Sequence, residues 1–242
     1  MRTKLLFLVF TLCVISTPVM ADMYGTVPVT YEGLVLGYDT LQVSSDGGTY
    51  YSPEINVGLQ QLTLGTLNDS GAPDELPLDS YLVEGSVLAF CVDLSGGFPI
   101  VDDQIYNAVS LDVPPVTGGS MGDDKALFIA GLLKAYSYAN ALDAAAMQVA
   151  MWEIIYEDFD TNGWDLTTGD LLLGSGDDED DVATRANEML DGLSQASTYS
   201  EYTALSEAGK NYQDFVLVPV PAAVILGILG LGVAGWKLRR FA

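Results

Sequence analysis

The sequence predicts an α+β fold: a mostly antiparallel β core with a helical layer or insertion, plus one C-terminal transmembrane helix. Short runs rich in Val, Leu, Tyr and Thr fill residues 23–93, and Gly, Asp, Pro and Ser separate them, which indicates strands. Between residues 125 and 157 the apolar residues recur at helical spacing. Residues 215–236 are apolar and carry no charge. The order strands, helices, strand is typical of α+β domains.

The expected strands lie at both ends of the predicted domain. The last is NYQDFVLV at 211–218, which leads into the apolar segment and shares residues 215–218 with it. The earlier runs are MYGTVPVTY, GLVLGY, VGLQQLTLG and GSVLAFCVDL.

Three helices are expected between these strands. A loop over 112–124 ends in Asp123 and Asp124, which suit the positive N-terminal end of a helix. The break before the second helix falls at 140–143, with Asp143 as its candidate N-cap. The helical runs are KALFIAGLLKAYSYANA, LDAAAMQVAMWEIIYE and SGDDEDDVATRANEMLDGL.

The N-terminus has the pattern of a secretory signal peptide over residues 1–21. Arg2 and Lys4 form its positive region, and Leu5 to Ile15 is an apolar run too short to span a bilayer. We therefore expect cleavage after Ala21 and an extracellular domain over residues 22–214.

The C-terminus carries a second targeting feature. Phe215 to Trp236 would reach about 33 Å as a helix, enough to cross a hydrocarbon core of about 30 Å. The basic residues that follow predict a cytoplasmic tail at 237–242, with the upstream domain outside. This pattern alone fits an ordinary single-pass anchor.

The sequence VPVPAAVILGILGLGVAGWKLRR resembles the PEP-CTERM sorting signal. The matching features are a proline motif at Pro219 and Pro221, a glycine-rich apolar helix, and a short basic tail with Arg239 and Arg240. The resemblance implies an exosortase-type sorting enzyme that removes the signal and passes the protein to the surface. The Glu usual between the prolines is Val220 here.

Charge and composition exclude several classes of function. The chain has a formal net charge of −24, and all 33 acidic residues lie within 22–214. A nucleic-acid partner is excluded because little positive charge is present to neutralise phosphates. Histidine is absent from the whole chain, which removes Ser-His-Asp and Cys-His catalysis and imidazole metal sites.

The two cysteines are Cys13, inside the expected signal peptide, and Cys91. Cys91 lies among apolar neighbours, and Gln148 lies in the middle of a helix that is apolar nearly all round. A buried amide needs hydrogen-bond partners, since leaving it unpaired costs about 1–3 kcal/mol. Two interpretations stay open: a buried free thiol with a core glutamine bonded to backbone, or a Cys91–Gln148 thioester formed with loss of ammonia.

A family resemblance favours the thioester. Phe90-Cys91-Val92-Asp93 resembles the aromatic-Cys-aliphatic-acid motif of the thioester domains of bacterial surface adhesins. The helix sequence QVAMWEII, with Gln148, Ala150, Trp152 and Glu153, resembles their Gln-x-Ala-aliphatic-Trp-Glu motif. The resemblance covers about residues 85–170 and implies covalent coupling to amines on a target. The Thr frequent before the glutamine is Met147 here.

The general base for such chemistry is open from sequence. Asp93, Glu153, Glu157 and Tyr156 are near one of the two partners in the chain. Asp93 also suits a solvated or turn-capping role.

A calcium loop is a second, separate expectation. Asp158, Asp160 and Asn162 are spaced as in the first half of such a loop, and Gly163 follows. Position twelve is Gly169 in place of the bidentate Glu, and a turn with solvated acids explains the same residues. No other cofactor is expected.

These features together predict an exported bacterial surface protein, anchored at the membrane or released after C-terminal processing. Its Cys91–Gln148 thioester would serve covalent adhesion or cross-linking to an amine or hydroxyl on a surface or matrix target, without turnover and therefore not as an enzyme. The alternative is an exosortase-sorted structural or matrix surface protein with a free buried cysteine. A calcium-dependent sugar-binding module is a third possibility.

Overall fold

The computed structural model describes residues 23–45, 47–48, 55–69, 84–94, 103–116, 119–157, 163–207 and 212–218. Several sequence predictions lie outside these residues. They are the signal peptide, the basic tail, the sorting residues Pro219, Pro221, Arg239 and Arg240, and the calcium-loop residues Asp158, Asp160 and Asn162.

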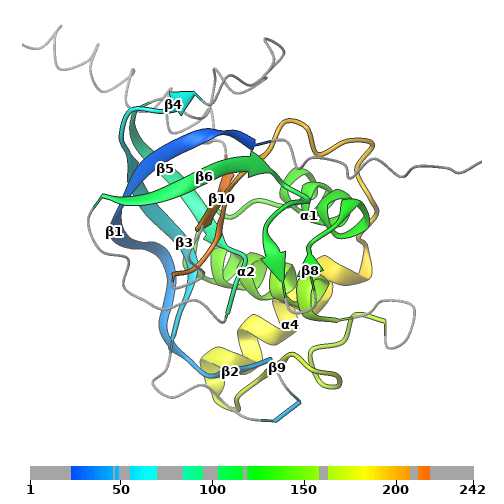
Figure 1. Ribbon diagram of the computed structural model, residues 1–242. Coiled ribbons are helices and arrows are strands. Elements are labelled where there is room, and N and C mark those ends of the chain that lie inside the picture. Colours follow the sequence, from blue (N-terminus) through cyan, green and yellow to red (C-terminus); the bar gives the residue numbers. More distant parts are fainter. Residues whose placement is uncertain are drawn as a thin grey trace, which may run out of the picture.

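The main sheet is antiparallel and has seven strands in the order β3-β5-β11-β10-β6-β1-β4 (Figure 1). Two further pairs are short: β2 (Val43–Ser44) with β9 (Leu172–Leu173), and β7 (Pro115–Val116) with β8 (Gly119–Ser120). The strands of the main sheet are β1 (Met23–Leu41), β3 (Ile55–Leu64), β4 (Asn68–Asp69), β5 (Gly85–Cys91), β6 (Gln104–Ser110), β10 (Thr203–Glu207) and β11 (Phe215–Val218).

The long strand β1 closes the sheet on itself. Its first part pairs with β6 and its later part with β3, and Val29 takes part in both pairings, opposite Gln104 and Leu64. Further along, Gly37 pairs with Gly58. A Cβ on either glycine would collide with the main chain of the other strand, and both have positive φ (143° and 139°). Glycine is therefore required where these two strands approach most closely.

In the described residues, three helices form a layer against the strands (Figure 1): α1 (Asp123–Ala135), α2 (Ala141–Tyr156) and α4 (Asp177–Asp191). Helix α2 contacts β1 and β3 on one side and α1 and α4 on the other. Every residue from Ala144 to Ile155 is buried, as its nearly uniform apolar sequence predicts. The predicted α+β class, with an antiparallel core and a helical layer, is confirmed for the described residues.

One detail of the prediction was wrong, and one overlap between two predictions is resolved. The N-cap of α2 is Asn140, whose side chain accepts a hydrogen bond from Asp143 N at 2.8 Å, so Asp143 lies in the first turn instead. Residues 215–218 were assigned both to the last strand (211–218) and to the start of the membrane segment. They form β11, which is fully buried and paired with β10 and β5, so the strand prediction is confirmed for them. In the described part of the chain, no helix has both the length and the apolar character needed to cross a membrane.

Candidate functional site

The structure brings Cys91 and Gln148 into contact although 57 residues separate them in the chain. The Cys91 N–H donates to Gln148 Oε1 at 2.9 Å, and Gln148 Nε2 donates back to the Cys91 carbonyl oxygen. The described β3–β5 register ends two residues earlier, at Gln60 opposite Ala89. The Gln148 carboxamide thus pairs with Cys91 as a neighbouring strand would, and it has hydrogen bonds at both of its polar atoms.

The Cys91 thiol is enclosed. Its residue is 1% exposed, and the Sγ–H donates to the Asp93 carbonyl oxygen at 2.9 Å. Burial raises the pKa of this thiol well above its usual value, and the negative charge of Asp93 acts in the same direction. The thiol is therefore protonated at neutral pH. Forming a thioester requires Sγ to leave Asp93 and approach Gln148 Cδ.

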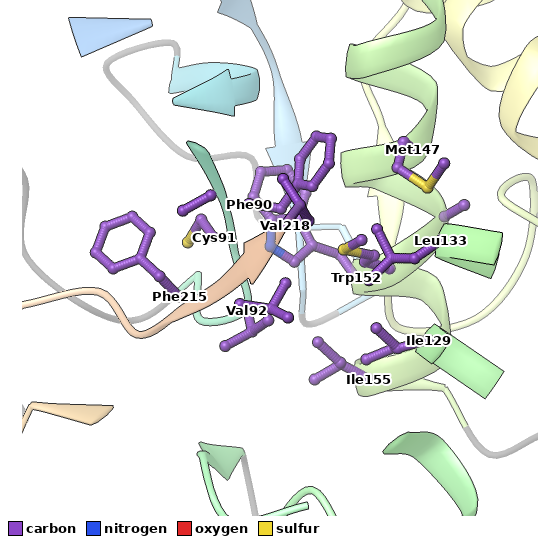
Figure 2. Close-up of a cluster of buried hydrophobic side chains, with 14 of the residues drawn as sticks. Phe90, Cys91, Val92, Ile129, Leu133, Met147, Trp152, Ile155, Phe215 and Val218 are labelled. Carbon is purple, nitrogen blue, oxygen red and sulfur yellow. The ribbon is translucent and has the colours of Figure 1, made fainter. Parts of the chain in front are cut away.

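Three side chains on α2, at positions i, i+4 and i+8, lie along the segment from Cys91 to Leu94. Gln148 bonds the main chain of Cys91, and Trp152 lies one turn further on. Tyr156, another turn on, accepts from Leu94 N at 2.9 Å and donates to Asp93 Oδ1 at 3.3 Å. Figure 2 shows Trp152 extending from the helix toward the end of β5, where Cys91 and Val92 lie beside Phe215.

The apolar members of the two sequence motifs support this contact. Phe90 is fully buried and meets Tyr138 edge to face, with ring centroids 5.5 Å apart. Ala150 and Met147 are fully buried in α2. They hold the helix against the strands and bring no reactive group to the site.

Two of the proposed bases belong to a different part of the fold. Glu153 Oε1 accepts from Asp165 N at 2.9 Å, and Glu157 Oε1 accepts from Leu171 N at 2.8 Å and from Asp170 N. These carboxyl groups bind the segment that follows α2 to the helix through hydrogen bonds. Burial raises the pKa of Glu153 to about 8. Among the named candidates, only Asp93 and Tyr156 adjoin Cys91.

Asp214, which sequence reasoning missed, is a further acid near the thiol. Its carbonyl accepts from Val92 N at 2.9 Å, and its carboxylate accepts from Glu207 N at 2.7 Å. It is 2% exposed, burial raises its pKa to about 7, and its charge also raises the pKa of Cys91. A single acid directly before the apolar run FVLV was the signal available in the sequence.

The described residues contain no group of three acidic or cysteine side chains placed to hold a metal ion. A surface depression of about 480 Å³, lined by Leu34, Val35, Gly37, Tyr38 and Asn56, includes neither Cys91 nor Gln148. Since Cys91 and Gln148 are at most 1% exposed, an external amine reaches them only after a local opening of the fold.

No protein-family model and no curated protein matches this chain. Two solved structures are similar to it, both with a TM-score of 0.36 and 11% identity. One is the N-terminal thioester domain of a surface protein from Clostridium perfringens, matched over 74% of this chain and 99% of that one. The other is the N-terminal thioester domain of fibronectin-binding protein SfbI from Streptococcus pyogenes, matched over 76% and 100%. Similarity at this level does not establish a shared activity.

Proposed function

We propose that this chain is an exported surface protein whose folded domain forms an internal Cys91–Gln148 thioester and uses it to attach covalently to an amine on a surface or matrix target. The observation that carries the proposal is the reciprocal pair of hydrogen bonds between the Gln148 carboxamide and the Cys91 main chain. The pair holds the electrophilic Cδ beside the residue that bears the only cysteine thiol outside the predicted signal peptide.

The arrangement supports the chemistry of thioester formation. The Cys91 sulfur attacks Gln148 Cδ, the Cδ–Nε2 bond breaks, and the thiol proton leaves with the nitrogen as ammonia. Negative charge that develops on Oε1 meets the Cys91 N–H, which already donates to that atom. No cofactor is needed. The bond would close a 57-residue loop and stabilise the fold by roughly 4 kcal/mol if the disulfide entropy relation applies.

Capture of a target completes the proposal. An amine attacks Cδ, the Cδ–Sγ bond breaks, and the amine proton passes to the sulfur, leaving an amide at Gln148 and a free Cys91 thiol. Each molecule reacts once, so the protein is not an enzyme. Burial protects the thioester from water until the site opens locally.

The proposal includes sorting to the surface. An exosortase-type enzyme would recognise the proline motif and basic tail of the C-terminal segment. Because β11 occupies Phe215 to Val218, that segment begins at Pro219 in this proposal.

A second candidate function has its own supporting observation. Gln148 is fully hydrogen-bonded and the Cys91 thiol is buried and bonded to Asp93, which is also what a purely structural pair requires. In that case the chain is a structural surface protein without covalent chemistry.

Incubating the full chain with a biotin-linked primary amine distinguishes the two. The thioester protein becomes labelled at Gln148, and Cys91→Ser and Gln148→Ala abolish labelling. Gln60→Ala, which alters another buried glutamine, is the control that keeps it. Absence of label on the wild type, both folded and after partial unfolding in mild denaturant, refutes covalent capture.

A further inference from the structure

The indole N–H of Trp152 is an unused hydrogen-bond donor inside the core. The residue is 1% exposed, and Nε1 has no hydrogen-bond partner among the described residues. A buried donor without a partner costs about 1–3 kcal/mol. An apolar side chain carries no such donor, so the placement of an indole here needs an explanation.

Trp152 and Cys91 belong to the same buried cluster, and the Trp152 side chain extends from α2 toward Cys91 (Figure 2). Trp152 lowers the pKa of the Cys91 thiol, because an N–H close to Sγ favours the thiolate. Burial and the charges of Asp93 and Asp214 raise the same pKa. In the present state Nε1 makes no hydrogen bond, and Sγ donates its own proton to the Asp93 carbonyl oxygen. Figure 2 shows the indole extending toward Cys91 from the helix that also carries Met147 and Ile155.

Other donors near the sulfur are already engaged. The Cys91 N–H bonds Gln148 Oε1, and the Tyr156 hydroxyl donates to Asp93. Lys125 Nζ donates to the Ile155 carbonyl at the end of α2. Asp93 and Asp214 bring negative charge, which opposes a charged sulfur. Of the donors named here, the Trp152 indole N–H is the one without another acceptor.

We propose that Trp152 is a catalytic residue of the thioester chemistry, donating its indole N–H to the Cys91 sulfur whenever that sulfur carries negative charge. This inference rests on the proposed function. During formation the N–H stabilises the sulfur as its proton departs and its electron pair attacks Gln148 Cδ. During capture it stabilises the same sulfur as the Cδ–Sγ bond breaks and its electrons return to Sγ.

The test measures how fast methylamine opens the thioester in the full chain, followed by intact mass. Trp152→Phe keeps an aromatic ring and removes the donor. Trp164→Phe is the matched control, because Trp164 packs against Phe128 with ring centroids 4.5 Å apart and is not among the groups that act on the Cys91 thiol. Hydrogen bonds to charged groups contribute about 1.5–3 kcal/mol, so Trp152→Phe should open roughly tenfold to hundredfold more slowly.

The direction of the change separates this role from packing. A residue that only fills space would, when trimmed, loosen the site and speed methylamine entry. Site-specific replacement of Trp152 by benzothienylalanine, which retains the ring shape with sulfur in place of N–H, should also slow opening at unchanged Tm. If it prevents thioester formation instead, the Tm should fall with the lost cross-link. Opening as fast as in the wild type, or faster, in both variants overturns the inference alone. A wild-type protein without a thioester overturns the proposed function and this inference together.

Discussion

At Gln148, one carboxamide holds the main chain of a residue 57 positions earlier in the sequence. Its two hydrogen bonds continue the β5 ladder after the described pairing with β3 has ended. The same geometry places the amide carbon beside Cys91. Gln148 therefore has a structural role and a proposed chemical role, and mutations must be chosen to separate the two.

Gln148→Ala in a Cys91→Ser background measures the hydrogen bonds alone, since neither protein can form a thioester. The substitution leaves the buried N–H and C=O of residue 91 without partners, and we expect a loss of about 2–4 kcal/mol of unfolding free energy. Urea denaturation monitored by circular dichroism gives the value. A loss below about 0.5 kcal/mol, within the range of ordinary surface substitutions, would contradict the structural role.

Glu153 gives the fold a pH dependence of defined sign. Its pKa rises from 4.5 to about 8 on folding, so between these values the folded protein holds a proton that the unfolded chain has released. Stability is thus full below about pH 4.5 and falls as pH rises toward 8, by up to about 1.4 kcal/mol per pH unit from this group.

Glu153→Gln mimics the protonated form and removes this contribution. We expect its unfolding free energy to fall less steeply between pH 5 and 8 than that of the wild type, with the buried Asp214 carboxyl, whose pKa is also raised, still contributing in the same direction. Parallel curves for the two proteins would show that Glu153 does not titrate in this range.

At the scale of elements, helix α2 is what positions Gln148, Trp152 and Tyr156. Its first turn depends on Asn140, and Asp143 in that turn also pairs with Arg185 of α4 at 2.8 Å. The orientation of the site is therefore fixed at the beginning of the helix as well as along its buried length.

Asn140→Ala should cost about 1 kcal/mol, because the N–H of Asp143 loses its acceptor. Asn140→Ser retains a side-chain oxygen and should recover most of that loss. Thermal unfolding of the three proteins checks this order. Equal Tm values for the alanine and serine variants would mean that the cap contributes nothing.

The sequence predicted the elements with clear patterns and missed those without one. Acidic starts and apolar spacing identified α2 and α4 to within two residues at each end, and α1 at its start. The predicted end of α1, residue 141, was six residues too late, because α1 ends at Ala135. Strands β6 and β10 were not predicted. β10, TALSE, is buried at every position, so it lacks the alternation that marks a half-buried strand, and Ala, Ser and Glu have little β preference.

The same limit applies to the candidate site. Two separated motifs identified Cys91 and Gln148, which the fold brings together. The sequence did not reveal that Asp214 lies near the thiol or that Gln148 bonds the Cys91 main chain. The first depends on the pairing of β5 with β11, and the second on where the pairing of β5 with β3 ends. Such register is set by long-range contacts, which a local pattern does not encode.

For the whole molecule, the dominant property is a formal net charge of −24. Mutual repulsion of the acidic residues opposes the compact state, and salt screens it, because the Debye length falls from about 30 Å at 0.01 M to about 8 Å at 0.15 M. At low salt this repulsion therefore lowers the unfolding free energy of the domain.

Raising NaCl from 0.01 to 0.15 M should therefore raise the Tm of the full chain by a few degrees, equivalent to about 1 kcal/mol. Calcium at matched ionic strength is the control and should give the same rise. A saturable extra rise that disappears in Asp158→Ala or Asp160→Ala would instead reveal a dedicated calcium site. A Tm independent of salt would contradict the repulsion argument.

The central claim is a covalent bond between Cys91 and Gln148, and intact mass tests it most directly. The full chain and its Cys91→Ala variant are processed alike, so their mass difference is independent of cleavage at either end. We predict a difference smaller by one ammonia than the substitution alone produces, and a gain of one methylamine by the wild type only. A difference equal to the substitution, with a thiol that titrates freely after unfolding, would contradict the thioester and leave Cys91 and Gln148 as a structural pair.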